Sequence, residues 1–201
     1  MYPAKLLLFF LLVVFSAFNI QVSKPYLVKW VISNGCSLKV GGSTNINKFS
    51  CVIKNYSRPD TLTFYRKDAS DQLNMYGALK LDVANFDCLN PVMTSDLRKT
   101  LKAKEYPKLV VRFLSLSKYP DDNKKENTLK GRVSIELAGV TKQFNVDYRV
   151  VTNKNNSLNV VGTRQINFSD FNIVPPRKIG GMIQTNNELN VEFNLNVKVL
   201  N

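Results

Sequence analysis

The sequence predicts an all-β protein whose antiparallel strands either close into a barrel or stack into a sandwich. Apolar and polar residues alternate through two long segments, 129–150 and 188–199, and a turn at Gly139 divides the first of them. A period of two puts one face of a strand against a core and the other in water. The function of such a protein depends on what its apolar interior holds.

The chain begins with a predicted secretory signal peptide over residues 1–21. Lys5 precedes an apolar run at 6–18 that is interrupted only by Ser16. The run is shorter than the roughly 20 residues that a spanning helix needs, and it fits the apolar region of an export signal. An uncleaved membrane anchor is the alternative. We therefore expect a periplasmic or secreted protein with one domain over 27–201.

Short alternating or apolar segments predict eight to ten strands for this domain. They lie at 27–32, 37–43, 49–53, 61–65, 78–83, 109–116, 129–150 (a hairpin), 158–168 and 188–199. One segment is different, because Asn90 can cap a helix and Pro91 suits its first position. The apolar spacing that follows predicts a short helix over 91–104. Two prolines and two glycines predict a loop at 174–181.

The three cysteines are Cys36, Cys51 and Cys88. Export to an oxidising compartment permits one disulfide and leaves one thiol. Cys51 shares strand parity with its apolar neighbours, and Cys88 follows a strand end, so Cys51–Cys88 is the preferred pair. No short cysteine spacing or histidine is present, and a metal site is not expected.

The net charge of +13 comes from 28 Lys and Arg against 15 Asp and Glu. Such an excess favours anionic partners, including an anionic membrane surface. The basic residues are scattered, and the densest group is Lys99, Lys102 and Lys104. A solvated surface is the alternative interpretation. Since no basic ladder interleaved with aromatic residues is present, we expect no nucleic-acid partner.

The chain contains no histidine. This excludes Ser–His and Cys–His nucleophile pairs and histidine acids and bases. Adjacent carboxylates occur at Asp121 and Asp122, and Asp68 lies near Asp71, but both pairs fall in polar stretches typical of turns. We therefore expect a protein that is not an enzyme and needs no cofactor.

Four segments in the right order resemble motifs of the YceI-like family. They are GGSTNINKF at 41–49, EYPKLVVRF at 105–113, LKGRVSIELAGVTKQF at 129–144 and INFSDFNI at 166–173. The resemblance spans roughly residues 30–200. The chain departs from the family where many members carry Asp-x-His-Leu before the Tyr-Pro motif. Asn167 and Asn172 also replace the more usual Arg and Gly.

The resemblance implies a lipocalin-like, up-and-down barrel of about eight antiparallel strands that holds an apolar lipid such as a polyisoprenoid. The ligand would contact the inward-facing apolar side chains. These are Leu79, Leu81, Val83, Leu109, Val111, Phe113, Val133, Ile135, Phe144, Val146, Tyr148, Val160, Ile166, Leu189, Val191, Phe193 and Leu195.

Two questions stay open from the sequence alone. A packed core uses the same apolar residues, so a solid structural or protein-interaction module of the envelope is the alternative function. Gly131 and Gly162 on the inward parity either leave room for a ligand or let the strands bend. In the carrier hypothesis, the basic group above, with Arg177 and Lys178, helps the protein approach anionic headgroups.

Overall fold

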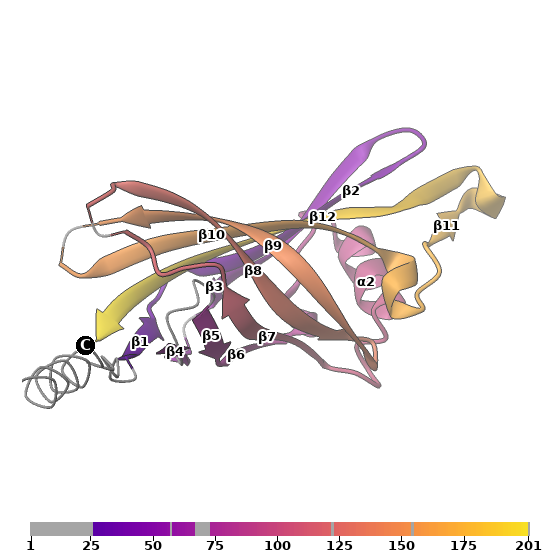
Figure 1. Ribbon diagram of the computed structural model, residues 1–201. Helices are drawn as coiled ribbons and strands as arrows, with labels where there is room; N and C mark the ends of the chain where they lie inside the picture. The colour runs from indigo at the N-terminus through magenta and orange to yellow at the C-terminus, as the bar shows by residue number, and fades with distance from the viewer. Residues whose placement is uncertain (1–25, 57, 67–72, 122, 154, 201) are drawn as a thin grey trace, which may run out of the picture.

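The structure, a computed structural model, describes residues 26–56, 58–66, 73–121, 123–153 and 155–200. The predicted signal peptide lies outside these residues. Within them no helix is long and apolar enough to cross a membrane. Figure 1 shows an elongated body of strands with its one described α-helix at one end.

Strands make up most of the described chain, as the alternation predicts. They are β1 (Tyr26–Ile32), β2 (Cys36–Thr44), β3 (Lys48–Tyr56), β4 (Thr61–Arg66), β5 (Leu73–Tyr76), β6 (Ala78–Asp82), β7 (Lys108–Leu116), β8 (Glu126–Leu137), β9 (Val140–Thr152), β10 (Ser157–Asn167), β11 (Arg177–Lys178) and β12 (Ile183–Leu200). The helices are α2 (Pro91–Thr100) and the short 3-10 segments η1 (Val83–Asn85), η2 (Phe168–Phe171) and η3 (Ile179–Gly181).

The strands close into a barrel. Eight of them follow one another in the order β1-β4-β5-β7-β8-β9-β10-β12, and β12 also pairs with β1. All of these pairings are antiparallel. The barrel with about eight strands and one α-helix is therefore confirmed, and the sandwich is excluded.

Strand β12 is 18 residues long, so two different strands can pair with it along the same edge. Its stretch from Thr185 to Asn194 pairs with β2, and its end from Val197 to Leu200 pairs with β1. The β2–β3 hairpin thus replaces β1 and β4 at the end of the barrel where α2 lies. The order is up-and-down from β4 to β10 and departs from it only here.

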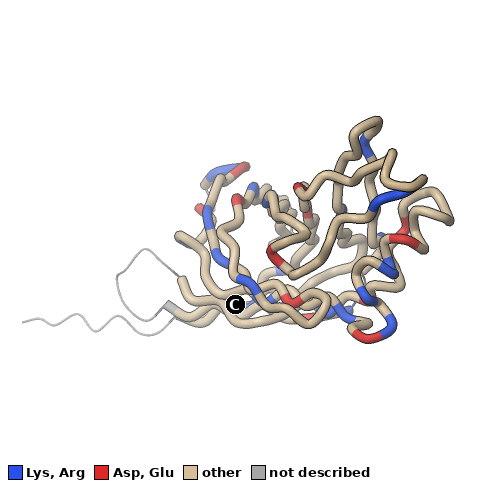
Figure 2. The backbone as a smooth tube through the Cα atoms, turned by 90° about the vertical axis from the view of Figure 1, so that its right-hand side faces the viewer, with Lys and Arg blue, Asp and Glu red and all other residues tan. Residues whose placement is uncertain are grey.

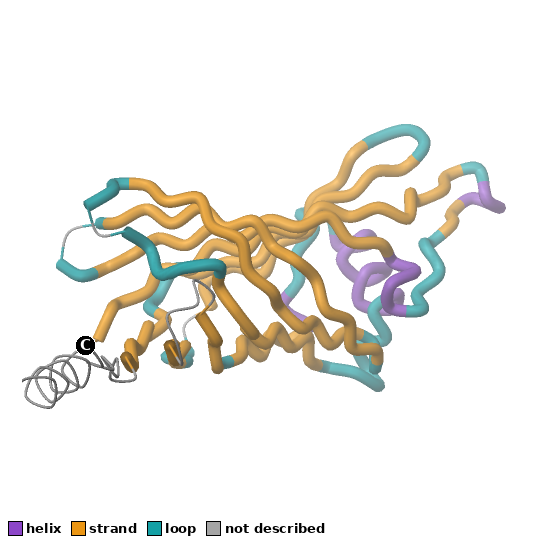
Figure 3. Tube along the Cα trace, viewed as in Figure 1, coloured by secondary structure: helices purple, strands orange, loops and turns teal. Residues whose placement is uncertain are grey.

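Helix α2 is held at this end by its N-terminal residues. The side chain of Asn90 accepts a hydrogen bond from the Met93 amide at 3.0 Å, and Thr94 Oγ1 accepts one from the Cys88 amide at 3.0 Å. A disulfide joins Cys88 to Cys51 of β3. The helix is thereby fixed across the barrel end, as Figure 3 shows.

The helix ends at Thr100, earlier than the 104 expected from the spacing. Lys102 takes a left-handed conformation, with φ at 53°, and the Ala103 amide donates to the Arg98 carbonyl at 2.9 Å. This arrangement is a common way to terminate a helix. The predicted loop at 174–181 contains only the short β11 and η3.

The opposite end of the barrel is packed by aromatic rings. The centroids of Trp30 and Phe64 lie 4.4 Å apart, and Trp30 Nε1 donates to the hydroxyl of Tyr119 at 3.3 Å. Trp30 and Phe64 are 2 % exposed. Because this end is solid, any interior space has to lie toward α2.

Candidate functional site

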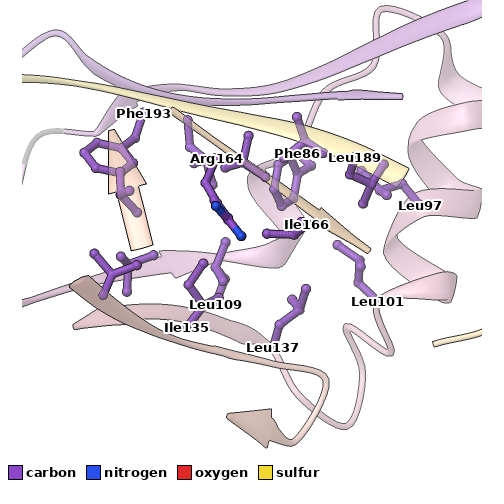
Figure 4. A pocket seen from close by; sticks show the side chains of 16 residues that line it. Phe86, Leu97, Leu101, Leu109, Ile135, Leu137, Arg164, Ile166, Leu189 and Phe193 are labelled. Atoms are coloured by element: carbon purple, nitrogen blue, oxygen red, sulfur yellow. The ribbon is translucent and has the colours of Figure 1, made fainter. Parts of the chain in front are cut away.

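A cavity lies between α2 and the inner walls of the barrel (Figure 4). Its atom-free space is about 730 Å³, including solvent at its mouth, but the centre of a water molecule can occupy only about 60 Å³ of it. The cavity is therefore narrow. Its lining consists of Leu38, Val40, Phe86, Leu97, Leu101, Leu109, Val111, Val133, Ile135, Leu137, Val146, Arg164, Ile166, Leu189, Val191 and Phe193.

The inward-facing residues predicted to contact a ligand divide into two groups. One group lines the cavity: Leu109, Val111, Val133, Ile135, Val146, Ile166, Leu189, Val191 and Phe193. The other group is outside the lining: Leu79, Leu81, Val83, Phe113, Phe144, Tyr148, Val160 and Leu195. In this second group only Phe144 is half-buried, and the rest belong to the buried core. Ligand contact by the first group stays a prediction.

Three aromatic rings form the floor that separates the cavity from the solid end. The Phe193 centroid lies 5.9 Å from that of Phe113 and 5.7 Å from that of Tyr148. Phe193 lines the cavity, whereas the other two rings are buried behind it. The interior is thus open on the α2 side of this floor and filled beyond it.

The inward glycines make room for neighbouring atoms of the barrel rather than for a ligand. A Cβ atom at Gly131 would first meet the backbone carbonyl oxygen of Ser115 and would lie 2.8 Å from Cε2 of Tyr148, and one at Gly162 would lie 2.6 Å from Cε1 of Phe193. Real Cβ atoms do not come so close to neighbouring atoms. The sequence left open why these two positions are glycine, and this close approach of neighbouring atoms is the reason.

Several lining residues did not enter the sequence-based ligand set. Leu97 and Leu101 come from α2 and the turn after it, and Phe86 from the segment before it. The helical spacing of Leu97 and Leu101 predicted a packed helix but not the barrel end that it covers. Others could have been found by parity alone: Leu38, Val40, Leu137 and Arg164.

Arg164 is the one charged side chain in the lining. It lies on β10 between inward-facing Gly162 and Ile166, opposite Val191 of β12. Figure 4 shows its guanidinium directed into the middle of the cavity. The residue is exposed to solvent in that space, and it has neither a hydrogen bond nor an ion pair with another described residue.

A second hollow lies outside Leu97, which lines both spaces. It runs between α2, the β2–β3 turn and the β11–η3 segment, and we call it the vestibule. Its rim includes Ile46, Val92 and Ile179, which are 64 %, 70 % and 66 % exposed. Lys178 Nζ lies 2.6 Å from the Asp96 carboxylate and ties β11 to α2 across the vestibule.

The predicted basic group lies outside the cavity. Lys99, Lys102 and Lys104 line a separate hollow on the surface beside α2. Charges of both signs are spread over strands and loops in Figure 2, without one dominant basic face in that view. The approach of this basic group to anionic headgroups stays a prediction.

The cavity offers little chemistry beyond apolar contact and one guanidinium. Its lining contains no carboxylate, thiol or hydroxyl side chain. Among the described residues, no group of three or more His, Cys, Asp or Glu side chains is placed to hold a metal ion. Burial raises the pKa of the Cys36 thiol, and a hydrogen bond from the Asn196 amide opposes this, but Cys36 does not line the cavity.

Several solved structures resemble this fold, and two of them illustrate the likeness. A polyisoprenoid binding domain from Saccharophagus degradans, implicated in plant cell wall breakdown, is 12 % identical, with a TM-score of 0.59, over 87 % of this chain and 100 % of that chain. BcnA from Burkholderia cenocepacia is 16 % identical, with a TM-score of 0.51, over 82 % of this chain and 96 % of that chain. At these identities the likeness shows the fold alone.

No curated protein matches the chain significantly. The model of the YceI-like domain matches residues 28–197, which include every strand from β2 to β11 and most of β1 and β12. The family resemblance of the four sequence motifs is thereby confirmed. The chain belongs to the family of YceI-like domains.

Proposed function

We propose that this protein is an exported, non-catalytic lipid-binding protein that holds a long apolar chain inside its barrel. The observation that carries the proposal is the narrow cavity under α2, whose lining is apolar apart from Arg164. The similar domain from Saccharophagus degradans binds polyisoprenoid. A polyisoprenoid or a comparable lipid chain is accordingly the ligand class that we assign.

The binding energy comes from removing the chain from water. Each buried CH₂ group contributes about 0.8 kcal/mol, and association costs several kcal/mol in lost freedom of motion. A handful of isoprene or methylene units therefore suffices for net binding. Because the hydrophobic effect has no directional requirement, apolar walls are enough for this part of the ligand.

The vestibule supplies a route to the cavity. Leu97 is the side chain that the two spaces share, and it is only partly buried. A lipid chain that displaced Leu97 would pass from the exposed apolar rim into the barrel. In this proposal the rim also contacts the membrane surface from which the lipid is taken.

Export and lack of catalysis rest on separate observations. The apolar run at 6–18 and the Cys51–Cys88 disulfide both suit an oxidising compartment outside the cytoplasm. The chain has no histidine, and the cavity lining has no acid–base pair. A binding role needs neither.

The test is to produce the protein with its predicted export signal and to purify it without detergent. Its organic extract is then analysed by mass spectrometry. Val191→Phe should fill the cavity and abolish lipid recovery. Val199→Phe is the matched control, because Val199 is also half-buried on the same face of β12 but lies beyond the aromatic floor. Lipid in wild-type protein and Val199→Phe, but not in Val191→Phe, supports the proposal.

The opposite result is equally clear. If wild-type protein carries no lipid and takes none from vesicles of bacterial lipids, the barrel is a solid structural or interaction module. Equal recovery from the two phenylalanine variants would place the lipid outside the cavity.

A further inference from the structure

We propose that the ligand is an amphiphile with an anionic end, a carboxylate or a phosphate, and that the Arg164 guanidinium binds this end inside the barrel. The inference rests on the proposed function, because it names the chemical class of the lipid held in the same cavity. It adds a polar site to a binding mode that otherwise needs none.

The position of Arg164 breaks the pattern of its strand. The inward-facing residues of β10 are Leu158, Val160, Gly162, Arg164 and Ile166, and the ladder with β12 places Arg164 opposite Val191. Every other side chain in the cavity lining is apolar. An arginine with no structural partner suits this wall poorly, because an aliphatic side chain would pack there at a lower cost in free energy.

The guanidinium offers a planar fork of N–H donors and a positive charge, and it has no acceptor atom of its own. None of the described residues accepts a hydrogen bond from it or forms an ion pair with it, and no carboxylate lines the cavity. Within the cavity this positive charge is without a partner, and an anionic ligand group would supply one.

The space around the group suits such a ligand. Arg164 is exposed as a residue although its side chain is directed into the barrel, and it lines the cavity that a ligand would enter. The planar fork of N–H donors matches the two oxygens of a carboxylate or phosphate. Apolar walls around the pair lower the local dielectric and strengthen the attraction.

The same geometry sets the direction of the ligand. Val191, the partner of Arg164, precedes Phe193 by two residues, which corresponds to about 7 Å along the strand. Little room remains between Arg164 and the aromatic floor. The anionic end therefore enters first, and the apolar tail extends past Leu97 and Leu101 toward the vestibule.

The experiment compares three probes with the same tail: hexadecanoate, hexadecyl phosphate and hexadecanol. Each displaces a fluorescent lipid from delipidated protein at concentrations below those at which the probe aggregates. We expect wild-type protein to bind at least one anionic probe about tenfold or more tightly than the alcohol, as a charged hydrogen bond in an apolar site provides. The probe with the larger preference identifies the headgroup.

Arg164→Gln should lose this preference and keep its affinity for hexadecanol, while Arg164→Lys should retain part of it. Arg149→Gln is the matched control, because Arg149 is exposed on the outer face of the neighbouring strand β9. An equal affinity for alcohol and anions in wild type, or an unchanged preference in Arg164→Gln, overturns the inference. If no probe binds, including the alcohol, the proposed function itself fails.

Discussion

A Cβ atom at Gly162 would lie 2.6 Å from both Cε1 and Cε2 of Phe193, so the bare backbone of Gly162 provides the space in which that ring lies. The two residues are direct partners in the β10–β12 ladder. Of the three rings in the aromatic floor, that of Phe193 is the one that lines the cavity. This glycine–phenylalanine pair therefore positions the surface at which the cavity ends.

Gly162→Ala should destabilise the protein by about 1–3 kcal/mol, because the new methyl group pushes the Phe193 ring from its site. Urea unfolding measures this cost. Combining the substitution with Phe193→Leu should recover part of it, since the smaller side chain leaves room for the methyl group. Strictly additive effects would show that the two residues do not compete for one space.

Removing the Cys51–Cys88 disulfide should lower the free energy of unfolding by about 4 kcal/mol, as the loop-entropy relation gives for this separation. The sequence separation is 37 residues. The bond also joins β3 to the segment that leads into α2, where Val52 and Asp87 form only an isolated bridge. A double serine variant tests this by urea unfolding, with reduced wild-type protein as the control. Equal stability of oxidised and reduced wild type would contradict the prediction.

Tyr148→Phe should leave the stability unchanged or raise it by up to about 1 kcal/mol. The Tyr148 hydroxyl is buried and has no hydrogen-bond partner among the described residues, so removing it removes an unmet desolvation cost. Thermal unfolding of the two proteins checks the sign. A loss above about 1 kcal/mol would reveal a buried water or ligand atom bound to the hydroxyl.

Tyr56 should make the protein less stable at high pH. Burial, and then the hydrogen bond that its hydroxyl donates to Asp60, raise the pKa of Tyr56 from the ordinary 10 to about 12. Because the pKa is raised in the folded state, the contribution of the Tyr56 hydroxyl to the free energy of unfolding is complete below pH 10 and is lost as the pH rises through 12. Urea unfolding across this range should show a shallower decline for Tyr56→Phe. Parallel curves would contradict the assignment.

Asp96→Asn should change stability by less than about 1 kcal/mol, because its ion pair with Lys178 is partly exposed. It should nevertheless speed lipid exchange, since the pair ties β11 to α2 across the vestibule. Stopped-flow displacement of a fluorescent lipid measures the rate. Glu136→Gln is the control, because it breaks the Arg112–Glu136 pair on the barrel wall. Identical exchange rates in the two variants would exclude a role for the Asp96 tether.

The secondary structure and the choice of inward face could be read from the chain. Alternation in 129–150 and 188–199 predicted β8, β9 and β12, and Asn90–Pro91 marked the start of α2. The cysteine pair preferred from the sequence is the pair that the structure joins. These features are local, because the side-chain period and a helix cap depend only on neighbouring residues.

The tertiary structure alone decided which inward positions are filled and which are open. Val160 and Val191 share an inward face, yet one is packed in the core and the other lines the cavity. Parity gives the face of a residue but not its depth along the barrel. Depth follows from the register of β10 on β12 and from the position of α2, both of which join residues far apart in the sequence. For that reason parity alone gives the inward face of Arg164, whereas its place in the cavity follows from the pairing of its strand with β12.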